Sequence, residues 1–265
     1  MFRKLNILIR QSHPFRFCIS RILSKIGFCP VTDFFGIKIR LGKSKLSQSI
    51  YTDGANQYKQ DALFVDANLL PTDVYVDIGA NIGTLACLAA KKVGEGGLVI
   101  AIEAHPRTFS ELCANIHLNN LTIIALMFAV GDHKGFVSFS DDPADDQNRV
   151  ATEGIPVYMT CLDSILPEML GEKRIKLLKI DVEGYEYFVL KGAAGIIDKV
   201  DMIYFEISTR MLLRNSITPL ELLNLLDSYG FAIKYPEGNF LNRGDYGNFN
   251  FEKTINLLAI RKQSE

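Results

Sequence analysis

The sequence from residue 74 onward alternates between two apolar patterns, and this alternation restricts the fold more than any other feature. Short runs rich in Val, Ile and Leu, such as residues 74–78, are followed by segments of helical periodicity, such as residues 82–92. Alternating strands and helices predict an α/β fold, in which helices cover both faces of a mostly parallel sheet. Only a polar loop joins the strand patterns at 231–235 and 254–262, which predicts an antiparallel pair at one edge.

The same patterns predict the individual elements. Strands are expected at residues 34–42, 74–78, 97–104, 122–130, 135–140, 174–182, 200–208, 231–235 and 254–262. Helices are expected at residues 56–70, 82–92, 105–120, 185–197 and 218–230. The last of these helices has Thr218 as its cap and Pro219 at its first position. The acidic segment 140–154 is rich in turn-forming residues and is expected to be a surface loop.

The composition is that of a folded globular protein. Hydrophobic residues make up 48% of the chain and charged residues 22%. The net charge of -1 gives no indication of a nucleic-acid partner, and we expect none. The five cysteines include no CxxC pair, which argues against a disulfide framework or a zinc knuckle. No apolar run reaches the roughly 18 residues that a membrane span requires.

The N-terminal segment is basic. Residues 1–32 contain Arg and Lys but no acidic residue, and the apolar residues after Pro14 recur at helical spacing. This pattern predicts a short basic amphipathic helix, which either packs on the rest of the protein, as we favour, or lies on an anionic membrane surface. We therefore divide the chain into an N-terminal extension with a β entry segment, residues 1–50, and a main domain, residues 51–265. The expected location is the cytoplasm, with the membrane surface as the alternative.

An acidic residue and a glycine-rich turn end the strand predicted at residues 74–78. Ligands of open α/β sheets bind outside the carboxyl ends of the strands, where this turn lies. Gly79 and Gly83 permit a tight turn and a close approach of backbone N–H groups to a ligand. The next helix begins near Ile82 and directs its positive end to the same place, which favours a carboxylate or a phosphate. Asp77 is placed to accept a hydrogen bond from a ligand ammonium group.

A second acid and two missing motifs indicate the chemistry of the ligand. Glu103 ends the next predicted strand, where a carboxylate can accept hydrogen bonds from both hydroxyls of a ribose. The turn lacks the GxGxxG spacing of dinucleotide-binding folds, and the chain has no GxxxxGK[ST] motif. An acid before the glycines repels a pyrophosphate but suits a zwitterionic amino-acid tail. Together these groups indicate S-adenosylmethionine, a nucleoside with such a tail.

Four stretches resemble the FkbM family of class I S-adenosylmethionine-dependent methyltransferases: VYVDIGANIGTLACLAA, VIAIEAHPRTFSELCANIHLNN, LLKIDVEGYEYFVLKGA and IYFEIS. The family pattern runs D-[IV]-G-A-N-x-G, then E-P before a helix with two asparagines, then K-[IV]-D-V-E-G-x-E. The resemblance covers residues 50–261, and it departs from the pattern where Ala104 and His105 separate Glu103 from Pro106. It implies a Rossmann-like class I methyltransferase fold with a mostly parallel sheet flanked by helices, an antiparallel edge pair and a small N-terminal helical and β extension.

The resemblance also implies the residues of a cofactor site. Glu103 would hold the ribose hydroxyls, and Val130 would flank the adenine. Asp132 is either an acceptor for the adenine amino group or a plain turn residue. The residues that would surround the methionine end of S-adenosylmethionine are Asp77, Gly79, Ala80, Asn81 and Gly83.

A second group of charged residues lies at the carboxyl end of the strand predicted at 174–182. Asp181 and Glu183 are on the same face of the chain, and Glu206 is near the end of the next strand. One of these carboxylates acts as a general base in the interpretation that we favour. The alternatives are a site for a divalent ion, which we do not expect, and a structural role in loops and ion pairs. Lys179 either takes part in the catalysis or neutralises the acids.

The function that the resemblance implies is O-methylation, dependent on S-adenosylmethionine, of a hydroxyl on a sugar, a glycolipid or a small-molecule natural product. The expected partner is therefore a hydroxylated small-molecule or saccharide acceptor. The alternative is a non-catalytic methyltransferase-fold module that binds S-adenosylmethionine or a partner without turnover. The intact set of acids and glycines argues against this alternative, because a module without turnover would be free to lose them.

Overall fold

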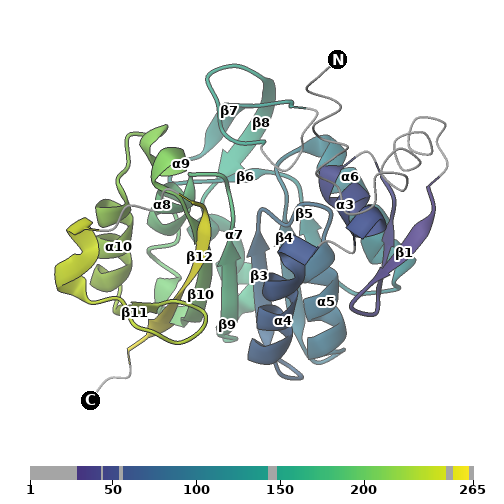
Figure 1. The fold of residues 1–265 in the computed structure, drawn as a ribbon, viewed down its shortest axis with the longest axis horizontal. Helices are drawn as coiled ribbons and strands as arrows, with labels where there is room; N and C mark the ends of the chain where they lie inside the picture. Colours follow the sequence, from purple (N-terminus) through teal and green to yellow (C-terminus); the bar gives the residue numbers. More distant parts are fainter. Residues whose placement is uncertain (1–28, 43, 54–55, 143–147, 249–252, 263–265) are drawn as a thin grey trace.

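The computed structural model describes residues 29–42, 44–53, 56–142, 148–248 and 253–262 of the 265-residue chain (Figure 1). The basic amphipathic helix predicted after Pro14 lies outside the described residues. Within the described ranges, no helix is long and apolar enough to cross a bilayer.

The described residues form a central sheet of seven strands in the order β11-β12-β10-β9-β3-β4-β5. Its neighbours pair in parallel except at β12, which runs antiparallel to both β10 and β11. The predicted antiparallel edge pair and the α/β fold class are thus confirmed. The bounds are β3 (Val74–Ile78), β4 (Leu98–Ile102), β5 (Ile124–Leu126), β9 (Ile175–Ile180), β10 (Val200–Ile207), β11 (Phe231–Lys234) and β12 (Ile255–Arg261).

The strand order changes direction at β3, which positions the site. The chain proceeds from β3 outward through β4 and β5, then returns to the other side of β3 to add β9 and β10. A ligand crevice forms outside the carboxyl ends of the strands at such a switch point. The segments after β3, β4, β9 and β10 therefore surround one place.

Helices cover both faces of the sheet and create two apolar cores. One core packs α4 and α5 on the face that carries Tyr75 and Tyr204. The other packs α7, α8 and α10 on the face that carries Val76 and Phe205. The helices are α3 (Lys45–Asp53), α4 (Lys59–Asn68), α5 (Thr84–Val93), α6 (Pro106–Leu118), α7 (Leu162–Leu170), α8 (Glu186–Lys191), α9 (Thr209–Leu213) and α10 (Pro219–Ser228), with 3-10 turns η1 (Asn56–Tyr58), η3 (Ile197–Lys199) and η4 (Arg243–Asn248).

Some predicted elements differ from those observed. The strand predicted at 122–130 is divided into β5 and β6 (Ala129–Val130), which belong to different sheets. Strand β6 pairs with β8 (Ile155–Thr160), and β8 pairs with β7 (Gly135–Phe139). We predicted neither β8 nor the helices α7 and α9. Strand β8 alternates exposed and buried residues over its first five positions, but Pro156 weakens the strand signal and Pro167 interrupts α7.

Residues 31–40 form a hairpin, where a single strand was predicted at 34–42. Strands β1 (Val31–Phe34) and β2 (Ile37–Arg40) are antiparallel, and the chain turns at Phe35 and Gly36, both with positive φ. The two family asparagines hold this hairpin: Asn115 Oδ1 accepts from the N–H of Arg40, and Asn119 exchanges hydrogen bonds with the backbone of Lys38. The domain boundary predicted at residue 50 falls inside α3.

Candidate active site

A cavity of about 320 Å³ lies at the carboxyl ends of β3, β4, β9 and β10. Its position is the crevice expected at the switch in strand order. Among the described residues that line it, one is a lysine, Lys179, and six carry carboxyl groups. These are Asp61, Asp77, Glu103, Asp181, Glu183 and Glu206.

The turn between β3 and α5 does not direct its first two N–H groups into the cavity. Gly79, Asn81 and Gly83 all have positive φ, as a tight turn requires. However, the N–H groups of Gly79 and Ala80 both donate to the carbonyl of Ile102 and do not face the cavity as donors. Helix α5 begins at Thr84, which lines the cavity, so the donors left for an anionic ligand group are those of its first turn.

Gly79 is required because another backbone passes close to it. A Cβ at this position would lie 1.9 Å from the carbonyl oxygen of Asp181, and φ is +79°. The absence of a side chain therefore lets the turn after β3 pack against the turn after β9. These two turns carry the D-[IV]-G-A-N-x-G and K-[IV]-D-V-E-G-x-E motifs of the family pattern.

Gly79→Ala is expected to lower the free energy of unfolding by about 2 kcal/mol or more, because it adds a clash to the strain of a positive φ. Gly94→Ala is the matched control, since Gly94 also has positive φ but a Cβ there would meet nothing within 4 Å. Urea unfolding gives the loss of unfolding free energy in each variant, and the difference between the two losses measures the clash with the Asp181 carbonyl. Equal losses in the two variants would contradict this role of Gly79.

Asp77 is a buried carboxylate in the wall of the cavity. It is 1% exposed, and neither of its oxygens accepts a hydrogen bond from the described residues. Lys179, its register partner on β9, places Nζ 3.3 Å from Asp77 Oδ1 as an ion pair. Burial raises the pKa of Asp77, and the charge of Lys179 opposes that rise. Since buried acceptors are normally satisfied, Asp77 Oδ2, which has neither a hydrogen bond nor this ion pair, fits a ligand ammonium group.

Glu103 lies at the end of β4, on the opposite side of the glycine turn. Its Oε2 accepts from the N–H of Asn81 and its Oε1 from the N–H of His105, both at 2.9 Å. Each carboxylate oxygen keeps acceptor capacity, which suits the two hydroxyls of a ribose. Burial raises the pKa of Glu103 to about 7, although these N–H groups act to lower it.

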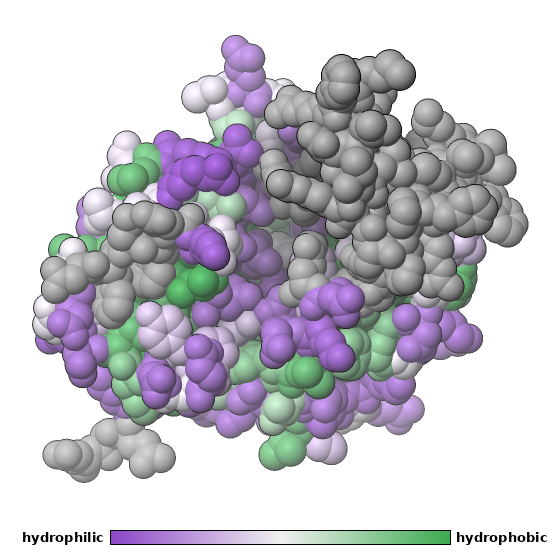
Figure 2. Space-filling model, in the orientation of Figure 1, coloured by the Kyte–Doolittle hydropathy of each residue, from purple (hydrophilic) through white to green (hydrophobic). Residues whose placement is uncertain are grey.

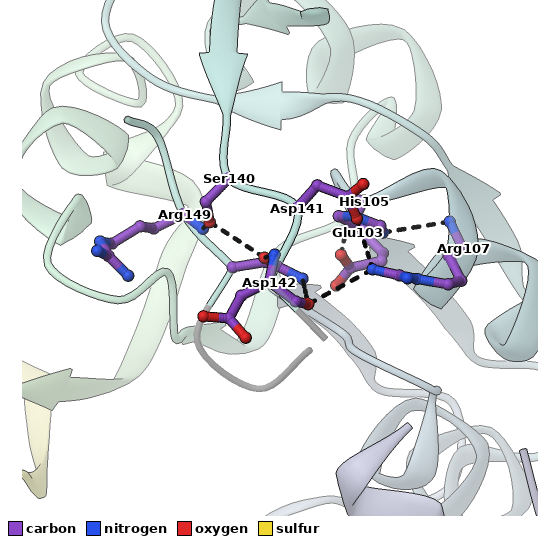
Figure 3. Close-up of polar contacts among 8 residues, drawn as sticks. Glu103, His105, Arg107, Ser140, Asp141, Asp142 and Arg149 are labelled. Atoms are coloured by element: carbon purple, nitrogen blue, oxygen red, sulfur yellow. Dashed lines mark hydrogen bonds and ion pairs between the residues drawn. The ribbon is translucent and has the colours of Figure 1, made fainter. Parts of the chain in front are cut away.

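His105 lies where the chain departs from the Glu-Pro pattern, between Glu103 and Pro106. It caps α6, because its Nδ1 accepts from the N–H of Arg107. Its Nε2 is 3.1 Å from Asp141 Oδ1, which also accepts from Arg107 Nη2 at 2.6 Å (Figure 3). His105 therefore connects the Glu103 turn to Asp141, which follows β7. Phe139 and Asn148, on either side of that segment, line the cavity.

The apolar wall of the cavity contains Val130, as predicted, but not Asp132. Among the described residues, Asp132 does not line the cavity, and its carboxylate is 2.9 Å from His133 Nδ1. Its proposed contact with adenine stays a prediction. Aromatic and small side chains that the sequence did not indicate complete this wall: Ala104, Phe128, Phe139 and Tyr185.

The structure brings Asp181, Glu183 and Glu206 together as predicted. A carboxylate oxygen of each lies within 4.8 Å of the others. Burial raises the pKa of Glu206, and the neighbouring charges of Asp181 and Glu183 raise it further. Glu206 Oε2 is buried without a hydrogen bond from the described residues. A protonated Glu206 beside two carboxylates follows from this arrangement.

Lys179 and Glu186 organise the acids around them. Lys179 Nζ lies 3.2 Å from Asp181 and 3.3 Å from Asp77, and so connects the two turns. Burial alone would lower the pKa of Lys179, but these two carboxylates outweigh burial and raise it. Glu186 Oε1 accepts from the N–H groups of Val182 and Gly184. This buried acid therefore stabilises the turn that contains Glu183.

Asp61 was not predicted and comes from α4, outside the family motifs. Its Oδ1 accepts from Tyr204 Oη at 2.6 Å and from Asn256 Nδ2 at 2.9 Å. Burial raises the pKa of Asp61, whereas the Tyr204 hydrogen bond and the charge of Lys179 lower it. Asp61 thus lines the same cavity as Asp77, but from helix α4, which covers the sheet.

The sheet order, the reversed last strand and a cavity lined by an acid near the end of β3 and an acid after β4 define a class I methyltransferase. The family model described as the methyltransferase FkbM domain matches residues 77–233, which is more than half of the chain. The protein therefore belongs to the FkbM methyltransferase family, whose methyl donor is S-adenosylmethionine.

Two curated relatives match part of the chain. The hexuronic acid methyltransferase AglP of Haloferax volcanii is 34% identical over 137 residues, which are 51% of this chain and 56% of that protein. Methyltransferase 1 of Beauveria bassiana is 29% identical over 153 residues, which are 48% of this chain and 61% of that protein. The chain thus matches little more than half the length of these relatives.

Solved structures resemble the fold at low identity. A putative rRNA methylase from Clostridium thermocellum has a TM-score of 0.48 and 11% identity, with 79% of this chain and 98% of that chain covered. TYW2 of M. jannaschii in complex with AdoMet has a TM-score of 0.44 and 15% identity, with 88% and 87% covered.

Proposed function

We propose that this protein transfers a methyl group from S-adenosylmethionine to a hydroxyl group of a saccharide. The observation that carries the proposal is the pair of buried acids at adjacent strand ends within the matched family region. Asp77 offers its Oδ2, which lacks a hydrogen bond, to the ammonium group, and Glu103 offers acceptors to the ribose. The saccharide is supported by the relative in Haloferax volcanii, the hexuronic acid methyltransferase AglP.

The bound cofactor would supply an electrophilic methyl group on a sulfonium. The acids of the protein then have separate tasks. Glu206 keeps its proton at neutral pH, because its pKa is raised, and Asp181 accepts a hydrogen bond from Lys179. Glu183 is therefore the carboxylate that we assign as general base for the acceptor hydroxyl. Lys179 holds Asp181 and Asp77 in place through its two ion pairs. Its pKa is raised, so it keeps its proton and transfers none in this scheme.

The experiment has a binding arm and a product arm. Calorimetric titration with S-adenosylhomocysteine is expected to give micromolar binding. Incubation with isotopically methyl-labelled S-adenosylmethionine and a hexuronate-containing oligosaccharide is then expected to give a methyl ether, which NMR distinguishes from a methyl ester on the carboxyl group. A folded sample without cofactor binding would contradict the proposal, and an ester product would replace hydroxyl by carboxyl as the methylated group.

A metal-assisted reaction is a second candidate, because three carboxylate oxygens lie within 4.8 Å of one another. We expect the titration and the transfer rate to be unchanged by Mg²⁺ or by a chelator. A rate that is lost with chelator and restored by Mg²⁺ would favour a divalent ion at Asp181, Glu183 and Glu206.

Asp61→Asn is expected to weaken S-adenosylhomocysteine binding roughly tenfold, because it removes a negative charge from the wall opposite the ligand ammonium. The amide oxygen can still accept from Tyr204 and Asn256, so the thermal midpoint should change little. Tyr204→Phe is the complementary control, since it removes the hydrogen bond to Asp61 that Asp61→Asn keeps, and it leaves the charge of Asp61 in place. Unchanged affinity in Asp61→Asn would exclude Asp61 from the cofactor site.

The cellular location of the protein and its contact with a membrane surface are also proposed. We propose that the protein acts in the cytoplasm, with residues 1–30 as the segment that would contact a membrane surface. Liposome pelleting of the full chain and of a variant lacking residues 1–30 tests this contact. Equal pelleting of the two proteins would exclude it.

A further inference from the structure

His105 is a buried polar side chain to which the proposed reaction gives no task. It is 3% exposed and precedes α6, two residues after Glu103. Its Nδ1 accepts from the N–H of Arg107, so this nitrogen carries no proton. The ring proton is therefore on Nε2, which lies 3.1 Å from Asp141 Oδ1 and donates to it (Figure 3). Both ring nitrogens are thus used, one for the helix cap and one for a bond to a different element.

Asp141 follows β7 and is held in place from both sides. Ser140 Oγ and the N–H of Asp142 both donate to Oδ1 of Asn148, at 3.1 and 2.8 Å. The N–H of Ser140 also donates to the carbonyl of Arg149. The backbone on either side of Asp141 is therefore attached to the segment that leads into β8, so Asp141 is a fixed partner for His105.

The hydrogen bond between His105 and Asp141 joins two walls of the cavity. On one side, Glu103 Oε1 accepts from the backbone N–H of His105. On the other side, Phe139 lines the cavity two residues before Asp141, and its ring centroid is 6.3 Å from that of His105. Figure 2 shows a hollow below β7 and β8, where the cavity lies, with hydrophilic side chains beside it. The bond therefore fixes the Glu103 turn relative to the sheet of β6, β7 and β8.

We propose that His105 is a positioning residue for the ribose of the cofactor, because its bond to Asp141 orients the turn at 103–106 and so directs Glu103 toward the ribose hydroxyls. This inference rests on the proposed contact between Glu103 and the ribose. A carboxylate that already accepts two N–H bonds has few directions left for further donors, and the N–H of His105 sets one of these bonds. A hydrogen bond to a carboxylate from a buried ring is of the strong, charge-assisted kind.

Two substitutions of His105 separate the bond to Asp141 from the helix cap. In H105N the amide oxygen can replace Nδ1 as the cap of α6, but the side chain is too short to reach Asp141. In H105Q the longer side chain can bring its amide N–H to the position of Nε2, and the cap is lost. A role limited to helix capping predicts that H105Q is impaired and that H105N resembles the wild type. Our inference predicts the reverse for ribose recognition.

The measurement is the preference for a ribose over a deoxyribose. S-Adenosylhomocysteine and its 2′-deoxy analogue are each titrated calorimetrically into the full-length protein. The wild type is expected to bind S-adenosylhomocysteine about tenfold more tightly or better, as one charged hydrogen bond provides. This preference should fall by a factor of about three or more in H105N and stay within about twofold of the wild type in H105Q.

D141A removes the other end of the same bond. Because H105N and D141A delete one interaction, the double variant H105N/D141A should lose no more of the preference than either single variant. D201A is the control for loss of a surface aspartate, since Asp201 accepts from Arg174 near the amino end of β10, at the opposite edge of the sheet. An unchanged preference in H105N, or losses that multiply in the double variant, would overturn the inference.

The two proposals fail in different ways. A folded wild type that does not bind S-adenosylhomocysteine contradicts the proposed function. Equal binding of S-adenosylhomocysteine and its 2′-deoxy analogue to the wild type overturns the ribose contact of Glu103 and this inference with it. A wild-type preference that H105N retains removes the inference alone and leaves the methyltransferase proposal intact.

Discussion

Glu183→Gln is expected to lower the rate of methyl transfer by on the order of 10²–10⁴-fold while leaving the affinity for S-adenosylhomocysteine unchanged. The amide has the shape of the carboxylate but cannot take the proton of the acceptor hydroxyl. Glu183 lines the cavity with φ of +57°, an uncommon conformation for a residue other than glycine. Strain of this kind is maintained where the surrounding structure fixes it, here through Glu186 and Gly184.

Single-turnover rates at saturating cofactor and acceptor provide the measurement. The matched control is Glu168→Gln, an exposed glutamate on α7, which should keep the wild-type rate. Glu186→Ala offers a second comparison, because it removes the acceptor for the N–H groups of Val182 and Gly184 and should lower the thermal midpoint. Full activity in Glu183→Gln would exclude it as the base and direct attention to Asp181.

The strand-end residues of the site were predictable because parallel strands fix their geometry. Asp77 and Lys179 are register partners on β3 and β9, and Lys179 is the partner of Tyr204 on β10. Residues in one row across a sheet point to the same face. An acid near the end of several strands is therefore brought to one place, which is why Glu103, Asp181 and Glu206 meet in one cavity.

The residues supplied by long-range packing were not predictable. Asp61 reaches the cavity only because α4 covers the sheet, and its partners Tyr204 and Asn256 are 143 and 195 residues away in the chain. No local motif marks it. Likewise, the need for Gly79 arises from the carbonyl of Asp181, a contact that exists only after β3 and β9 have paired.

Binding of S-adenosylhomocysteine is expected to tighten as the pH rises toward 7 and then to level off. Burial raises the pKa of Glu103 to about 7, so the carboxyl is largely protonated below that pH. Only the ionised form accepts from both ribose hydroxyls while keeping the N–H bonds of Asn81 and His105. Affinity should therefore fall by up to about tenfold for each pH unit below 7.

The stability of the ligand-free protein should change in the opposite direction. The folded pKa of Glu103 lies above its ordinary value of 4.5, so the folded state binds more protons between pH 4.5 and about 7. The contribution of Glu103 to stability is thus complete below pH 4.5 and is lost as the pH rises through 7. Glu186, whose pKa burial also raises to about 7, adds to this loss.

Glu103→Gln distinguishes the titration of Glu103 from that of Asp77, whose pKa is also raised. The amide accepts through one atom only, so affinity should fall by about 10²-fold, corresponding to one or two charged hydrogen bonds. The pH dependence that remains in the variant then belongs to Asp77 and its partner Lys179. Calorimetric titrations from pH 5.5 to 8 measure both effects. A wild-type affinity that is constant over this range, or a variant that keeps the full pH dependence, would show that Glu103 does not hold the ribose.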